Sequence, residues 1–263
     1  MTIRMGYADS SGGQIHFRKV AGSGVPVVFL HQTASSGKMW VKMMEAMAGD
    51  GRTLVALDTP GFGGSFDPPA DSKPSITQYG AWLREALADM GITRCHLVGH
   101  HTGSCIAVEL AARHPELAAS LIMLGPVPLT PEERLEFSRH FGTPFQPNVS
   151  GSYLLENWEY LRNLGAHTDP MLINREMSDQ LRAWWGRVQS YSAVWDQDFT
   201  GFYMAVKAPI MIAAAPEDVL RPYLARAAEL RPDALVLDVT GHNFEPDLDT
   251  ATLVAGLRGF IAE

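Results

Sequence analysis

Short runs of apolar, mostly β-branched residues recur along the chain, separated by segments in which apolar positions follow a helical spacing. The runs lie at residues 25–30, 53–57, 96–98, 121–124, 210–214 and 235–239. Runs of this length and composition are typical of strands buried on both faces. Residues 1–7 and 14–20 flank Asp9-Ser-Ser-Gly-Gly13 and predict a β-hairpin ahead of the first run.

Helical patterns occupy the segments between the runs, at residues 39–47, 76–90, 105–113, 223–230 and 250–261. Buried strands that alternate with helices indicate a parallel sheet covered on both faces, and the handedness of crossover connections makes such a sheet doubly wound. Ligands bind these sheets at the carboxyl ends of the strands. We therefore expect the chemistry in the loops that follow the strands.

Residues 126–206 break the alternation, because they contain helical patterns and no strand-like run. This segment also holds four of the six tryptophans, Trp158, Trp184, Trp185 and Trp195. A structureless loop of this length is improbable in a compact domain, so we predict a helical cap inserted into a core of residues 1–125 and 207–263. The tryptophans either form the interior of the cap or face an apolar or aromatic substrate, and Trp184 and Trp185 are the candidates for substrate contact.

One loop has the frame of a nucleophile elbow, the tight turn between a strand and a helix that lifts its central side chain above the sheet. It reads Gly99-His-His-Thr-Gly103, and its central residue is His101. Histidine is among the residues that tolerate a positive φ. Asp218 follows the run at 210–214 and His242 follows the last run, which gives the order elbow, acid, histidine.

These motifs and their order resemble the α/β-hydrolase superfamily over nearly the whole chain. His31 matches the H-G oxyanion loop of that family, with Gln32 in place of the glycine, and residues 57–65 resemble its D-x-P-G-x-G-x-S segment. The resemblance implies a mostly parallel, eight-stranded sheet with an inserted helical cap, and an enzyme of hydrolase type.

The chain departs from the family at the elbow, where a serine, cysteine or aspartate usually attacks the substrate. If the family geometry carries over, Asp218 orients His242, whose other ring nitrogen faces His101. Two imidazoles in contact hold one proton or none near neutral pH, which suits general acid–base catalysis. The resemblance also implies an oxyanion hole built from the backbone N–H groups of Gln32 and Thr102.

The residues around the elbow have further candidate roles. His31, Gln32, Thr33 and Thr102 are predicted to bind the oxyanion or the substrate, although His31 and Thr33 have the alternative of bonding only the backbone of their own loop. His100, before the apex, is expected to be structural. Ser104 is expected to begin the helix after the elbow and is not the predicted nucleophile.

Composition narrows the possible partners. The 263 residues carry a net charge of −8, so there is no basic surplus for nucleic acid or for a membrane surface, and a small molecule is the expected partner. The N-terminus lacks a signal-peptide pattern and no run is long enough to span a membrane, so we expect a cytoplasmic protein. The two cysteines and the histidine spacing predict neither a disulfide nor a metal or other cofactor. The oligomeric state is open, with a homodimer as one option.

The leading hypothesis is a cofactor-free hydrolase that acts on a small, largely apolar or aromatic ester, lactone or β-dicarbonyl. In it the His101/His242 pair, oriented by Asp218, activates water or the substrate. An alternative uses the same scaffold for a lyase, decarboxylase or cofactor-free oxygenase reaction that needs only proton transfer. A third hypothesis is a ligand-binding protein without catalytic activity.

Overall fold

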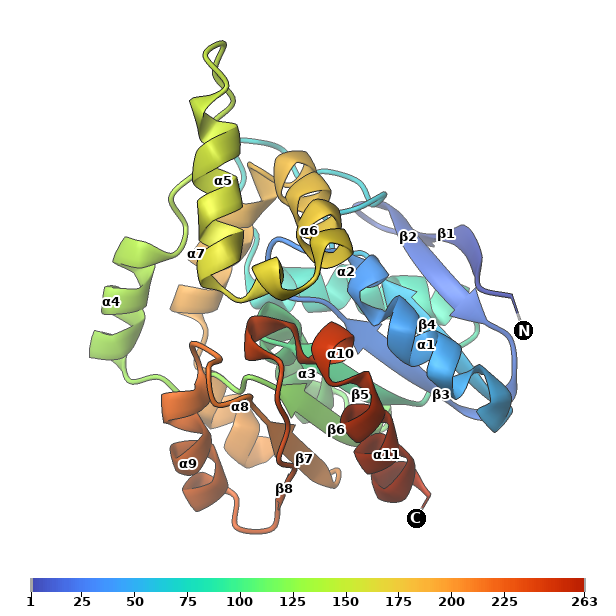
Figure 1. The fold of residues 1–263 in the computed structure, drawn as a ribbon. Coiled ribbons are helices and arrows are strands. Elements are labelled where there is room, and N and C mark those ends of the chain that lie inside the picture. Colours follow the sequence, from blue (N-terminus) through green and yellow to red (C-terminus); the bar gives the residue numbers. More distant parts are fainter. Residues whose placement is uncertain (1, 263) are drawn as a thin grey trace.

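The computed structural model describes residues 2–262, and its centre is a single eight-stranded sheet with the order β1-β2-β4-β3-β5-β6-β7-β8 (Figure 1). The strands are β1 (Arg4–Ser10), β2 (Gly13–Val20), β3 (Ser23–Leu30), β4 (Arg52–Leu57), β5 (Cys95–His100), β6 (Ala118–Leu124), β7 (Ile210–Ala213) and β8 (Leu235–Val236). β2 runs antiparallel to both of its neighbours, and all other pairs are parallel. The predicted fold class is confirmed.

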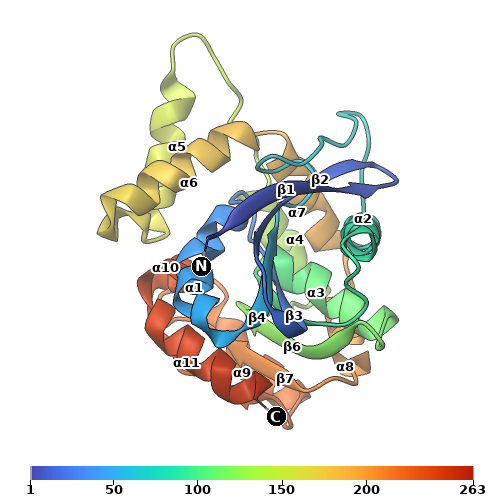
Figure 2. The same ribbon diagram turned by 90° about the vertical axis from the view of Figure 1, so that its right-hand side faces the viewer.

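Helices cover both faces of the sheet, which is why the central strands β5 and β6 are buried at nearly every position. Figure 2 shows α1 (Val41–Met47) and α11 (Thr250–Ile261) on one side, and α2 (Ile76–Asp89), α3 (Thr102–Arg113) and α8 (Phe199–Ala205) on the other. Along β3, Val27 and Phe29 pack into the core beneath α1 and α11, whereas Val28 and Leu30 pack into the core beneath α2 and α3. Successive side chains of β3 therefore point to opposite faces of the sheet and belong to two separate hydrophobic cores.

Between β6 and β7 the structure places five α-helices and, within residues 2–262, no strand. They are α4 (Pro131–His140), α5 (Ser152–Asn163), α6 (Pro170–Arg182), α7 (Gly186–Asp196) and α8. Figure 1 shows α5 and α6 projecting above the sheet. In contrast, α8 packs on α3, and its Phe199 and Tyr203 belong to the main core. The predicted cap boundaries at residues 126 and 206 stay a prediction. Because α8 packs on α3, we describe it as a helix of the core.

A buried ionic network joins α6 to the core. Arg175 contacts the carboxylate of Glu176 at 2.5 Å and that of Asp247, in α10 (Glu245–Leu248), at 2.7 Å. Ser35, in the loop after β3, donates to Glu176 at 3.0 Å. Burial raises the pKa of Glu176. Because buried charges need partners in close contact, this network holds α6 over the loop that follows β3.

No helix within residues 2–262 combines the length and the apolar character that a membrane span requires. Cys95 and Cys105 are buried free thiols.

Candidate active site

The elbow between β5 and α3 has the strained backbone that its motif predicts. His101 has φ 48° and ψ −107°. A Cβ at Gly103 would lie 2.1 Å from the carbonyl oxygen of Leu30, and one at Gly99 would lie 2.4 Å from that of Gly103. Only glycine allows strand, turn and helix to approach this closely. The turn therefore carries the His101 side chain out at the carboxyl end of β5.

His101 is hydrogen-bonded directly to Asp218, whose loop follows β7. The distance from His101 Nε2 to Asp218 Oδ2 is 2.7 Å, and Asp218 Oδ1 accepts from the backbone N–H of Leu220 at 2.6 Å. A Cβ at Gly125 would lie 2.2 Å from His101 Cδ2, so this edge of the ring is enclosed by backbone. His101 Nδ1 makes no hydrogen bond with residues 2–262. Since a carboxylate accepts and the Nε2–H donates, Nδ1 keeps a lone pair for accepting a proton.

The predicted arrangement with Asp218 behind His242 is wrong. His242 lies in a short 3-10 turn (His242–Phe244) with φ 56°, and a Cβ at Gly165 would lie 2.4 Å from its Cβ and 2.5 Å from its Cγ. Within the described chain its ring makes no hydrogen bond. An imidazole at the apex reaches farther than a serine hydroxyl, so it occupies the place beside the acid that a second histidine would need.

A second histidine–carboxyl pair lies behind the first. The His100 ring stacks on that of His101, with ring centroids 4.3 Å apart, and His100 Nε2 lies 3.0 Å from Glu245 Oε2. Burial and the nearby charge of Asp218 raise the pKa of Glu245 well above its usual range. Burial and then the neighbouring His101 hold the pKa of His100 well below its usual range. Both shifts favour the uncharged forms of Glu245 and His100.

The oxyanion loop contains one correction. His31 Nδ1 donates to the carbonyl of Gln32 at 2.7 Å, and its Nε2 accepts from the backbone N–H of Thr59 at 2.9 Å. Burial lowers the pKa of His31, so the ring is neutral, and both nitrogens are used. The prediction that His31 binds substrate is wrong. The alternative is what the structure shows, because both ring nitrogens of His31 bond to backbone groups. The backbone N–H groups of Gln32 and Thr102, the predicted oxyanion donors, make no hydrogen bond with the described residues.

A chain of hydroxyls joins the oxyanion loop, the elbow and α7. Thr33 Oγ1 lies 2.9 Å from Thr102 Oγ1 and 2.7 Å from Ser190 Oγ. Ser104, in contrast, is fully buried and donates to the carbonyls of Gly99 and Leu124 at 2.9 and 3.1 Å. It lies outside the cavity, in agreement with its predicted place at the start of the helix.

His101 opens onto a small cavity of about 40 Å³ lined mainly by aromatic and aliphatic side chains. The lining residues are Gln32, Thr33, His101, Thr102, Val127, Phe137, Phe141, Tyr160, Leu164, Tyr191, Val194, Trp195, Val219, Leu220 and Asn243. No carboxylate is among them, and His101 is their one titratable group apart from the tyrosines.

Trp195 lines this cavity, but Trp184 and Trp185 do not. The latter two line a separate hollow of about 480 Å³, and Trp185 Nε1 donates to the carbonyl of Ala70 at 3.1 Å. They lie where α6 ends and α7 begins and do not face the cavity at His101, so their predicted substrate contact stays a prediction. The helical spacing of Tyr191, Val194 and Trp195 was the signal for the true lining. Asn243, which follows His242 and lines the cavity, carried no such signal.

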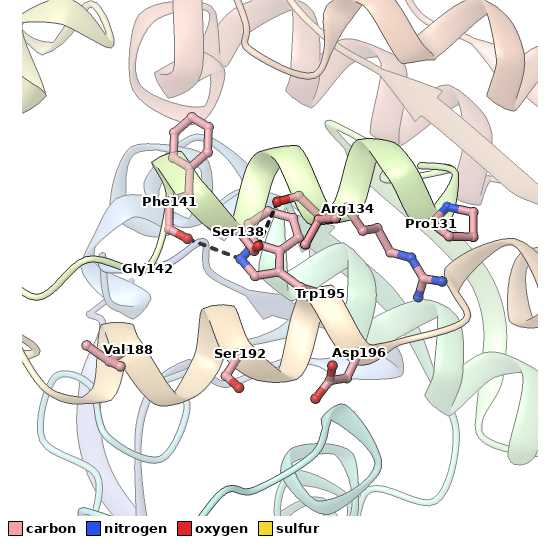
Figure 3. Close-up of a pocket in the computed structure, with 10 residues that line it drawn as sticks. Pro131, Arg134, Ser138, Phe141, Gly142, Val188, Ser192, Trp195 and Asp196 are labelled. Atoms are coloured by element: carbon pink, nitrogen blue, oxygen red, sulfur yellow. Dashed lines mark hydrogen bonds between the residues drawn. The ribbon is translucent and has the colours of Figure 1, made fainter.

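A thin aromatic wall separates the cavity from a larger outer pocket of about 460 Å³. Phe141 and Trp195 line both spaces. Figure 3 shows the hydrogen bond that fixes the wall, from Trp195 Nε1 to the carbonyl of Phe141 at 3.1 Å. Tyr191 stacks on Trp195, with ring centroids 5.6 Å apart. Since small-molecule sites usually enclose about 300 Å³ or more, a substrate larger than a few atoms needs this wall to move.

His100, His101 and Asp218 offer ligand atoms within 4.8 Å of one another. Two features disfavour a metal there. The two rings are stacked, so their in-plane lone pairs run side by side and do not meet at one point, and the facing atoms of His101 and Asp218 are already bonded to each other. The geometry suits an oriented base better than a metal centre.

Comparison with known proteins identifies the family. The family model described as alpha/beta hydrolase fold matches residues 25–157. The chain belongs to this family. The predicted membership is thereby confirmed.

The individual relatives match less than half of the chain. The chain is 29% identical over 121 residues to the dihydrolipoyllysine-residue acetyltransferase component of an acetoin cleaving system from Cupriavidus necator, which is 46% of this chain and 32% of that protein. It is 32% identical over 112 residues to a fluoroacetate dehalogenase from a Burkholderia species, which is 41% of this chain and 36% of that protein. The chain thus spans about a third of the curated relatives that it matches.

Solved structures match the whole fold. The structure of E-2-(acetamidomethylene)succinate hydrolase superposes with a TM-score of 0.80 at 20% identity and covers 100% of both chains. An enol-lactonase from Burkholderia xenovorans LB400 superposes with a TM-score of 0.79 at 17% identity, covering 98% of this chain and 100% of the other. At these identities the likeness establishes the fold.

Proposed function

We propose that this α/β-hydrolase is a cofactor-free hydrolase in which His101, oriented by Asp218, is the general base. Its substrate is a small, largely apolar or aromatic ester, lactone or β-dicarbonyl. The observation that carries the proposal is the 2.7 Å hydrogen bond from Nε2 of the elbow histidine to Asp218, which leaves Nδ1 as the proton acceptor at a cavity without other bases.

The proposed reaction needs no covalent enzyme intermediate. A water molecule attacks the substrate carbonyl and gives its proton to His101 Nδ1. The backbone N–H groups of Gln32 and Thr102 stabilise the resulting oxyanion, and Asp218 stabilises the imidazolium. When the tetrahedral intermediate collapses, the alkoxide or enolate leaving group takes the proton back from Nδ1. The base is then ready for the next turnover.

The surroundings of His101 support this chemistry. Ser104 cannot attack because it is buried and donates to two carbonyls, and Thr102 Oγ1 is engaged with Thr33. The aromatic lining favours an apolar acyl or aryl group. The names of the similar proteins, among them a dehalogenase, a succinate-derivative hydrolase and an enol-lactonase, favour hydrolysis as the reaction class.

Turnover in ¹⁸O-labelled water tests the proposal with a panel of neutral phenyl esters, monophenyl succinate as an ester with a free carboxylate, dihydrocoumarin and aryl β-diketones. We expect one ¹⁸O atom in each acid product and no labelling of the protein by a fluorophosphonate. Products without the label would instead indicate a lyase that works by proton transfer. Labelling of Ser104, or no turnover of any compound, would also overturn the proposal.

A further inference from the structure

Two arginines in residues 2–262 are buried, and they differ in their partners. Arg18 contacts Asp58 at 3.0 Å. Arg187 is 1% exposed, yet no Asp or Glu oxygen of the described chain lies within 4.0 Å of its guanidinium nitrogens. A buried cation without a counter-ion is costly, by several kcal/mol in typical cases. Arg187 therefore needs an explanation that Arg18 does not.

The neighbours of Arg187 compensate its charge only in part. Its guanidinium carbon lies 4.6 Å from the ring centre of Phe145, 5.0 Å from that of Tyr160 and 5.3 Å from that of Tyr191. Cation–π contacts use the faces of the guanidinium, whereas its N–H groups need acceptors in its plane. Nη1 donates to the carbonyl of Thr143, and Nε has no partner. The in-plane donors are thus largely unused.

The position of Arg187 connects it to the catalytic cavity. Residues 187, 191 and 194 follow the i, i+4, i+7 spacing of one face of α7, and Tyr191 and Val194 line the cavity. Tyr160, the other tyrosine beneath the guanidinium, lines it too. On the same helix, Ser190 is bonded to Thr33 beside the elbow. Arg187 therefore lies on the cap side of the cavity, one helical turn beyond its lining.

We propose that Arg187 binds a carboxylate group of the substrate. The substrate class is then a carboxylic acid that also bears the hydrolysable ester, lactone or β-dicarbonyl group, a narrowing that rests on the proposed function. A planar carboxylate accepts two parallel N–H groups of a guanidinium and supplies the missing counter-ion. The carboxylate is bound at the cap end while the carbonyl faces His101 at the core end.

Binding of unreactive probes tests this assignment. At pH 7.5, calorimetry compares phenylacetate with its neutral counterpart phenylacetamide. We expect the wild-type protein to bind the acid at least about tenfold more tightly, the usual range for a charge-assisted hydrogen bond. Arg187→Met should abolish this preference. Equal affinities in the wild type, or an unchanged preference in Arg187→Met, would overturn the proposal.

Arg134 provides a matched control. It also lies in the segment between β6 and β7, its Nη1 also donates to a backbone carbonyl, that of Gln197, and its Nε also lacks a partner. It lines the outer pocket and, unlike Arg187, stacks on neither of the cavity-lining tyrosines Tyr160 and Tyr191, so Arg134→Met should keep the preference for the acid. If Arg187→Met fails to fold, Arg187→Lys replaces it. Lysine keeps the charge but loses the bidentate geometry, so we expect the preference to fall several-fold.

The probes separate this proposal from the proposed function. Neither probe carries an ester, so the binding measurement does not depend on turnover. A preference for the acid that disappears in Arg187→Met, together with no hydrolysis of any panel compound, would support the carboxylate site and contradict the hydrolase. Hydrolysis without that preference would do the reverse.

Discussion

The two histidine loops of this protein have the same backbone strain and different surroundings. His101 and His242 are the two non-glycine residues in the described chain with a positive φ, 48° and 56°. Each ring packs against a glycine, Gly125 for His101 and Gly165 for His242. Only His101 reaches an acid, however, and only His101 lines the cavity. A strained backbone presents a side chain, but its contacts decide whether that side chain is suited to chemistry.

Replacing each histidine by alanine is the strongest way to break this comparison. His101→Ala removes the proposed base, so we expect kcat to fall about 10³-fold, within the usual range for general base catalysis. His242→Ala removes a ring without hydrogen-bond partners, so kcat should change less than about threefold. Both rates are measured on the best substrate of the panel. Equal losses in the two variants would restore a role for His242 and contradict the assignment.

Asp218→Asn sharpens the comparison by leaving both rings in place. The amide can present its NH₂ group to His101 Nε2, which moves the ring proton to Nδ1 and removes the lone pair from the cavity. We expect kcat to fall by about 10²-fold or more, with little change in KM. The exposed neighbour Glu217 is the matched control. If Glu217→Gln lowers kcat and Asp218→Asn does not, the orienting acid has been misassigned.

The two glycines allow the same comparison without touching either histidine. A Cβ at Gly125 would lie 2.5 Å from His101 Nε2, whereas a Cβ at Gly165 would meet the Cβ and Cγ of His242. Both glycines have positive φ, 61° and 98°, so alanine strains the backbone and should lower Tm in both variants. Only Gly125→Ala should also lower kcat, by about tenfold, because it displaces the base. A comparable loss of kcat in Gly165→Ala would show that the His242 loop takes part in catalysis.

Hydrophobic periodicity was sufficient to predict a parallel, doubly wound sheet, because each long element buries enough apolar surface for its spacing to be recognised. The number of strands came from the resemblance to the α/β-hydrolase superfamily. The runs at 25–30 and 121–124 lie within β3 and β6, and the helical pattern at 250–261 coincides with α11. The boundaries of short elements were less certain, since β8 retains only Leu235 and Val236 of its predicted run. Local patterns dominate where an element is long and buried.

The candidate site was only partly predictable, because its motifs place loops and do not measure the reach of side chains. The motifs located the elbow and Asp218, but family geometry assigned the acid to His242, and the imidazole at the apex takes that bond itself. The sequence also could not show which cap tryptophan faces inward, since that depends on how α7 lies against Thr33 and the elbow. The sequence does not show that Arg187 is buried without a counter-ion, because this depends on how the cap packs.

The smallest expected effect is a loss of folding stability at acid pH, which comes from the buried histidines His100 and His31. Burial lowers the pKa of both His100 and His31, so both stay neutral in the folded protein at pH values where the unfolded chain binds protons near pH 6.5. Stability is therefore fully present above about pH 6.5 and falls as the pH drops further. We therefore expect the free energy of unfolding and Tm to fall between pH 7 and 5.5. His100→Gln should make this slope shallower in thermal unfolding, and an unchanged slope would mean that His100 is protonated in the folded state.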